Sequence, residues 1–271
     1  MKTSMLPDGL KQEIAEVAKG QRCSASELVS AALQALKRQQ RSIYITAPVN
    51  ALVEGLYEQD TCIADIKARG DFGIGTFNDL DGEMVLIDGE VYQLKADGTV
   101  AKVDDDVKTP FACVCFFKAD ADEELNQPQT YEELNQVLEQ CIPSKNMLYA
   151  CRIEGRFKTV RTRSVPRQEN YRPLVEVTRH QVESVQHDLN GTLVGFYNPP
   201  FISSVNVPGW HFHFISEDRT SGGHLLECEL EQGRIELQHH SLMQLGLPVT
   251  LDYLTADFNR DTAKDLDEAE H

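Results

Sequence analysis

The stretch WHFHFISEDRTSGGHLLECEL, residues 210–230, has the most informative pattern in the chain. Residues two apart on a β-strand point to the same face, so His211 and His213 present two imidazole rings together while the phenylalanines turn to the other face. The glycines between His213 and His224 suit a turn that returns the chain as the neighbouring strand. The stretch therefore predicts a β-hairpin that brings three histidines together.

Three neutral imidazoles leave a divalent ion its full charge and an open coordination position, as expected of catalytic zinc. Alternating histidines also occur as plain surface residues, so the pattern alone leaves both interpretations open. The remaining histidines are interpreted as ordinary polar residues; they are His180, His187, His239, His240 and His271.

Short apolar runs separated by turn residues predict a strand-rich body from Ile43 onward. Asp88-Gly89 and Asp97-Gly98 separate the runs 84–87, 91–94 and 100–103 into hairpins, and residues 111–117 suit a buried strand. A capping box at Thr130 and Glu133 begins a helix that ends before Pro143. Further strands are expected at 148–153, 157–165, 191–196, 211–215, 225–230 and 235–239. The pattern predicts an α/β (α+β) body, residues 42–271, whose two sheets divide near residues 145–190.

Residues 1–41 predict an N-terminal helical extension of two short helices, the second with a capping box at Ser24 and Glu27. This segment also resembles the ribbon-helix-helix arms of small DNA-binding repressors, which would place a strand near Lys2–Leu6 in a major groove. The alternative is a helical hairpin that docks on the body or helps it to dimerise.

The composition, with 41% hydrophobic and 25% charged residues among 271, is that of a globular protein. The net charge of −17 argues against nucleic-acid binding by the body. Nucleic-acid binding stays open only for residues 1–41, which contain seven basic and four acidic residues. No apolar stretch is long enough to span a bilayer, and residues 1–10 lack the apolar core of a secretory signal. The seven cysteines include no CxxC pair and suit scattered thiols in a reducing compartment, so we expect a cytoplasmic protein.

Gly73 and Gly75 form a GxG pattern that no helix follows, which excludes a dinucleotide cradle. We expect a tight turn there, with Glu83 at the start of the next strand. Arg161 and Arg163 share one strand face and, by pattern alone, could equally be surface residues.

Several strings together resemble α-acetolactate decarboxylase, in the same order and with similar spacing over about residues 43–271. They are GDFGIGTFNDLDGEM, TPFACVCFF, YACRIEGRFKTVRTRSVP, GTLVGF, NVPGWHFHFI and SGGHLLECELEQG. The resemblance implies a two-sheet body that forms a homodimer. It does not include residues 1–41.

The resemblance also implies a site. Members of the family bind Zn²⁺ through the histidines that match His211, His213 and His224, and they use residues that match Glu83 and Arg163. A glutamate near the C-terminus matches Glu270, with Glu268 as a rival. This chain reads TRSVP where many relatives have TRTVP, which leaves the arginine unchanged.

The implied reaction is the decarboxylation of 2-acetolactate to acetoin and CO2 through a metal-stabilised enediolate, with no organic cofactor. Arg163 would hold the carboxylate or an enediolate oxygen, and the proton would come from Glu83, Glu270 or a zinc-bound water. Two alternatives stay open. One is a metal-binding β domain of the cupin kind, and the other is a metabolite sensor that binds DNA through residues 1–41.

Overall fold

The computed structural model describes residues 6–39, 41–169 and 172–270. The chain divides into two compact units, Met1–Arg41 and Ser42–His271. Among the described residues, none of the helices has the length and apolar character that crossing a bilayer requires.

The first unit consists of α1, Asp8–Gly20, and α2, Ala25–Gln39. The predicted capping box is confirmed, because the Ser24 backbone N–H donates to the Glu27 carboxylate at 2.7 Å and the Glu27 N–H donates to Ser24 Oγ at 3.2 Å. Its apolar positions are only partly covered, with Leu33 54% and Leu36 57% exposed. The strand predicted near Lys2–Leu6 lies, apart from its last residue, outside the described residues.

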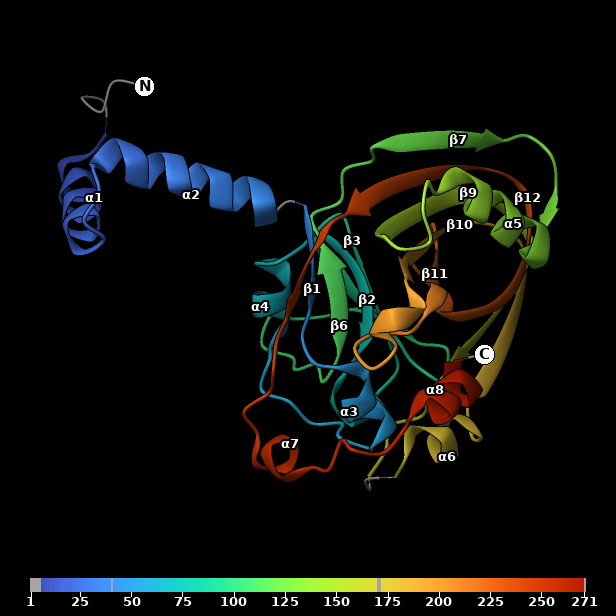
Figure 1. Ribbon diagram of the computed structural model, residues 1–271. Coiled ribbons are helices and arrows are strands. Elements are labelled where there is room, and N and C mark those ends of the chain that lie inside the picture. The colour runs from blue at the N-terminus through green and yellow to red at the C-terminus, as the bar shows by residue number, and fades with distance from the viewer. Residues whose placement is uncertain (1–5, 40, 170–171, 271) are drawn as a thin grey trace. The chain divides into compact units, whose positions relative to one another are not determined.

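The body contains two sheets, as predicted (Figure 1). The first has the order β13-β1-β6-β2-β3-β4-β5 and is antiparallel except for the parallel pair β1 and β13. Its strands are β1 Ser42–Ile45, β2 Phe72–Thr76, β3 Glu83–Ile87, β4 Glu90–Leu94, β5 Val100–Lys102, β6 Ala112–Cys115 and β13 Leu242–Leu245. The Asp88-Gly89 turn between β3 and β4 has positive φ at both residues, which is the backbone that a two-residue hairpin requires.

The second sheet has the order β11-β10-β9-β12-β7, with β8 also paired to β12. Because β11 also pairs with β12, the four strands β9, β10, β11 and β12 of this sheet form a closed ring of paired strands. Its strands are β7 Ala121–Leu125, β8 Gln129–Thr130, β9 Leu148–Ser164, β10 Val182–Asn198, β11 Gly209–Ser216 and β12 Gly222–His240.

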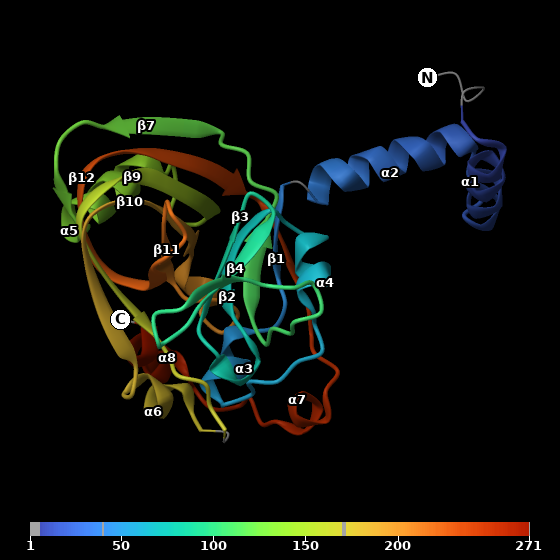
Figure 2. The same cartoon turned by 180° about the vertical axis from the view of Figure 1, so that it is seen from behind.

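Short helices complete the body, and α8 lies beside α6 in both views (Figures 1 and 2). The helix predicted after Thr130 is present, and its capping box is formed. The helices are α3 Val49–Val53, α4 Ile63–Lys67, α5 Tyr131–Cys141, α6 Leu174–Thr178, α7 Leu251–Thr255 and α8 Ala263–Glu270.

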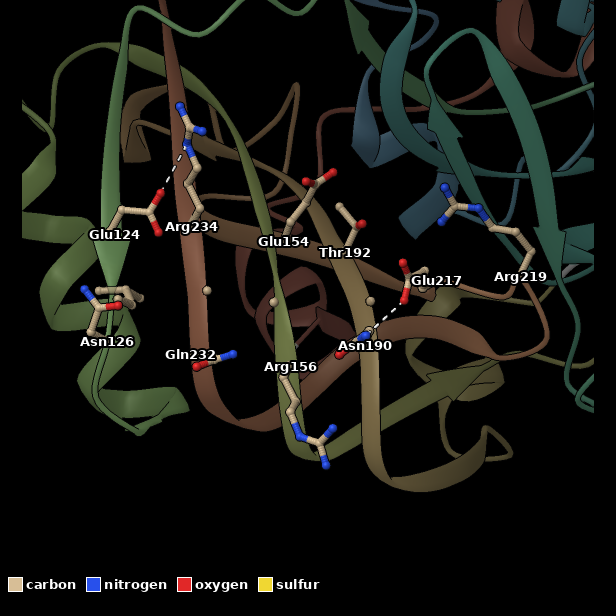
Figure 3. Close-up of a pocket in the computed structure, with 14 residues that line it drawn as sticks. Glu124, Asn126, Glu154, Arg156, Asn190, Thr192, Glu217, Arg219, Gln232 and Arg234 are labelled. Carbon is tan, nitrogen blue, oxygen red and sulfur yellow. Dashed lines mark hydrogen bonds and ion pairs between the residues drawn. The ribbon is translucent and has the colours of Figure 1, made fainter.

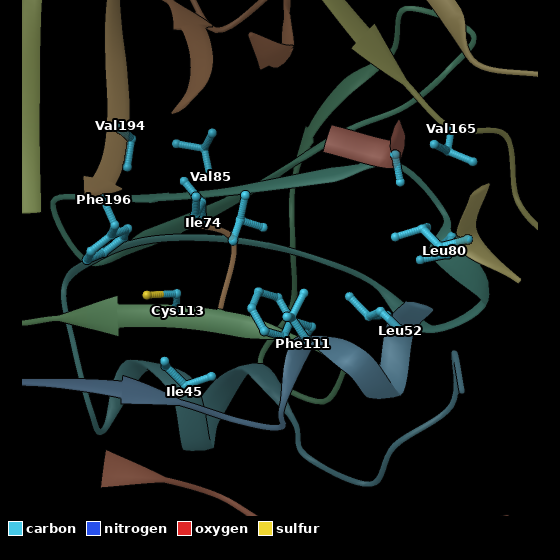
Figure 4. Close-up of a cluster of buried hydrophobic side chains, with 14 of the residues drawn as sticks. Ile45, Leu52, Ile74, Leu80, Val85, Phe111, Cys113, Val165, Val194 and Phe196 are labelled. Carbon is cyan, nitrogen blue, oxygen red and sulfur yellow. The ribbon is translucent and has the colours of Figure 1, made fainter. Parts of the chain in front are cut away.

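One apolar cluster joins the two sheets. In Figure 4, Val194 and Phe196 of β10 lie beside Ile74 and Val85 of the first sheet, and all four side chains are buried. A second cluster fills the closed part of the second sheet beneath α5. These clusters hold β3, β9, β11 and β12 in fixed relation, and those strands carry the candidate site.

Three expectations need correction. The sheets do not divide near 145–190, because the second sheet already begins at β7, Ala121–Leu125, and the chain returns to the first sheet at β13, Leu242–Leu245. The expected strand pairs 148–153 with 157–165 and 225–230 with 235–239 are each one long strand. Gly155 and Gly233 lie opposite each other in these strands. A Cβ on Gly155 would lie 2.7 Å from Leu230 Cδ1, so glycine makes room for the Leu230 side chain against the sheet.

The GxG segment is the buried strand β2, and the turn follows it, so that Glu83 does begin β3 as predicted.

Candidate metal and active site

Three neighbouring strands bring the predicted residues together. His213 on β11 lies directly opposite His224 on β12, and His224 lies directly opposite Arg163 on β9. Gly222 and Gly223 belong to β12 and pair with β11, whereas the turn occupies residues 217–221, so the prediction that these glycines form the turn is wrong. Gly223 has φ +155°, and a Cβ there would lie 2.6 Å from Arg163 O, so glycine lets the strand carrying Arg163 approach.

The three histidines converge. Their potential ligand atoms lie within 4.8 Å of one another, and His211 Nε2 is 3.1 Å from His224 Nδ1. His213 is 2% exposed, and burial lowers its pKa to about 4, which favours the neutral ring that binds metal. Its Nδ1–H donates to the Met84 carbonyl at 2.8 Å, which leaves Nε2 with its lone pair. The donor set therefore fits a divalent ion of the zinc class.

Two carboxylates flank the histidines. Glu83 Oε2 lies 3.6 Å from His213 Nε2, and Glu270 Oε2 lies 3.7 Å from both His211 Nε2 and His224 Nδ1. Burial raises the pKa of Glu83 to about 8 and also raises that of Glu270, while the Arg163 charge opposes both shifts. A cation held by the histidines would favour the ionised form of each carboxylate.

Arg163 supplies the positive charge of the site and is 5% exposed. Its Nη2 lies 3.4 Å from both Glu270 Oε2 and His224 Nε2, and its Nη1 donates to Gln181 Oε1 at 2.9 Å. Its Nε is buried and has no hydrogen-bond partner within the described part of the chain.

The structure separates the residues that the sequence left as rivals. Glu270 reaches the histidines from the end of α8, whereas Glu268 on the same helix is exposed and accepts from Arg179 at 3.1 Å. Arg161 likewise lies on the surface, where it pairs with Glu183 and Glu227. Of the histidines outside the site, His240 is wholly buried at the end of β12, which its sequence position did not indicate.

All six predicted site residues line one small cavity of about 50 Å³. Its other walls are mostly apolar, and no sequence pattern indicated them; they include Leu52, Phe111, Val165 and Val207. Gln181 was also missed. Sequence spacing gives no signal for it, because its contact with Arg163 depends on the pairing of β9 with β10.

A larger cavity of about 880 Å³ lies on the second sheet (Figure 3), and none of the six predicted site residues lines it. Its charged side chains are paired with neighbours: Arg234 with Glu124, and Glu217 with Asn190. No cluster of metal-ligating groups converges there among the residues described. Among the described residues, the group that could hold a metal ion is the one formed by His211, His213 and His224.

The chain is similar to known proteins over most of its body. The family described as "Alpha-acetolactate decarboxylase" matches residues 43–260. A protein of that name from Methanosarcina mazei is 40% identical over 84% of this chain and 80% of its own length. Another from Bacillus licheniformis is 38% identical over 88% of this chain and 95% of its own.

The fold agrees with this. The crystal structure of α-acetolactate decarboxylase from Bacillus subtilis strain 168 superposes with a TM-score of 0.83 at 38% identity, and the match covers 84% of this chain and 99% of that one. These matches confirm the resemblance and the two-sheet fold class that the sequence predicted. The chain belongs to the α-acetolactate decarboxylase family of enzymes.

Proposed function

We propose that the protein decarboxylates 2-acetolactate to acetoin and CO2, with a zinc ion held by His211, His213 and His224. One observation supports this above the others: three converging imidazoles share a buried cavity with two carboxylates and one arginine. When bound, the ion supplies a Lewis acid that stabilises negative charge on the substrate oxygens as CO2 leaves.

The chain's own residues bind the substrate and place the proton. Arg163 holds the substrate carboxylate, or an oxygen of the enediolate, through its planar fork of donors, and it stays charged throughout. The bond between the carboxylate carbon and its neighbour breaks, and its electron pair moves toward the ketone oxygen to give the enediolate. The carboxylate of Glu83 or Glu270 takes up a proton from solvent and delivers it to the carbon. Delivery of the proton by one carboxylate to one face of the enediolate would give acetoin of a single hand.

The experiment is to incubate the purified chain with racemic 2-acetolactate and to measure CO2 and acetoin together. We expect both products in equal amounts, at a rate proportional to enzyme concentration. Metal-loaded protein that releases neither product would refute the proposed activity and favour a metal-binding module of the cupin kind.

We also propose that the body forms a homodimer. A loop connects the edge strand β13 to α7. Four apolar side chains of this loop and of α7 are strongly exposed: Leu247, Val249, Leu251 and Leu254. Asp252 is the only charged residue in 241–256, so this surface lets two chains of net charge −17 approach. We expect sedimentation equilibrium to give twice the 30.5 kDa of the chain, and Val249→Asp to shift the species toward monomer. A wild-type mass of 30.5 kDa at micromolar concentration would contradict the proposal.

We further propose that the protein works in the cytoplasm. The seven cysteines are all free, and four of them are buried. Unpaired thiols of this kind suit a reducing compartment.

A further inference from the structure

Gln181 lies between α6 and β10, at the point where the chain enters the second sheet beside Arg163. Its backbone N–H donates to the Thr178 carbonyl at 3.0 Å. The next residues pair with β9, where Glu183 lies directly opposite Arg163. The fold therefore fixes the backbone of Gln181 next to the arginine.

The side chain of Gln181 makes the shortest contact of the Arg163 guanidinium. Arg163 Nη1 donates to Gln181 Oε1 at 2.9 Å, whereas Nη2 lies 3.4 Å from both of its partners. Gln181 Nε2 donates in turn to Glu183 Oε1 at 3.1 Å, and the other oxygen of Glu183 accepts from Arg161 at 3.2 Å. This chain of bonds fixes which end of the amide faces Arg163.

We propose that Gln181 is a positioning residue that holds Arg163 through a neutral acceptor and so keeps its positive charge available for the carboxylate of the substrate. The inference rests on the proposed function. Arg163 already has one carboxylate beside it, that of Glu270. A second carboxylate at the position of Gln181 would bind the guanidinium more strongly than the amide does and would compete with an anionic substrate. An amide fixes the guanidinium without that competition.

The test compares Gln181→Glu with Gln186→Glu, which introduces the same charge on β10 at a residue whose side chain donates to Ser184 Oγ at 2.9 Å. For Gln181→Glu we expect KM to rise roughly tenfold or more, with kcat changed much less. A hydrogen bond between charged groups changes affinity by roughly tenfold or more, and the introduced carboxylate would compete with the substrate for Arg163. For Gln186→Glu we expect both constants within about twofold of wild type.

A second measurement does not depend on turnover. Calorimetric titration with 2-hydroxy-2-methylbutanoate, a non-reactive hydroxy acid, should show the same loss of affinity in Gln181→Glu and none in Gln186→Glu. Metal content should be equal in all three proteins. If Gln181→Glu is unfolded by circular dichroism, Gln181→Met takes its place, and the lost acceptor should also raise KM several-fold.

Equal KM values and equal analogue affinity in the Gln181 and Gln186 variants would overturn the positioning role while leaving the proposed activity intact. A wild-type chain that binds the analogue but releases no CO2 would instead refute the proposed activity. The two failures are therefore distinguishable.

Discussion

His213→Ala is expected to lose its bound metal and to decarboxylate 2-acetolactate at least about a thousandfold more slowly than wild type. His213 is buried, its Nδ1–H is committed to the Met84 carbonyl, and its Nε2 faces the other two histidines. Removing the ring leaves two ligands, which hold a divalent ion poorly. Steady-state rates and metal analysis of the same purified samples measure both effects.

His187→Ala is the matched control, because His187 is exposed on β10 and contacts Thr159 outside the site. It should retain wild-type rate and metal content. Thermal unfolding of both variants distinguishes loss of the metal site from loss of the fold. A folded His213→Ala protein that keeps its metal and its rate would show that these histidines do not form the centre.

Glu270→Gln is expected to lower kcat about a hundredfold or more, whereas Glu268→Gln should stay within about twofold of wild type. Both residues lie on α8 and both changes remove one negative charge. Only Glu270 reaches the histidines and Arg163, while Glu268 pairs with Arg179 at the surface. The pair therefore separates a role in the site from a general effect on the helix.

Deleting residues 266–271 gives an independent check of the same prediction. Leu266 and Ala269 are the buried residues of α8, so the deletion removes the helix's apolar anchor as well as Glu270. A deletion variant with wild-type turnover, or equal rates for the two glutamine variants, would exclude the C-terminal helix from the mechanism.

Strand periodicity predicted the three histidines of the candidate site, whereas Glu83, Arg163 and Glu270 came from the resemblance to the family. Alternation places His211 and His213 on one face, and the return of the chain brings His224 opposite His213, which is the observed register. The hairpin turns and both capping boxes were also predictable, because they depend on residues close in sequence. Such local signals extend over a few residues only.

What the sequence could not predict depends on long-range pairing. The contact between Arg163 and Gln181 exists because β9 and β10 pair in one register. The choice between Glu268 and Glu270 depends on how α8 lies on the body, since both are acidic residues on one short helix. The sequence pattern divides β9 and β12 into two strands each, because nothing local shows that Gly155 and Gly233 lie opposite each other in a continuous sheet. Tertiary packing decides these three points.

The central claim is that decarboxylation depends on one metal ion held by three histidines. Its most direct test removes metal from the wild-type chain with a chelator, adds zinc back in steps, and follows CO2 release. We predict that the stripped protein is inactive and that the rate rises linearly until one zinc is bound per chain. Full decarboxylation by the metal-free protein would contradict the claim.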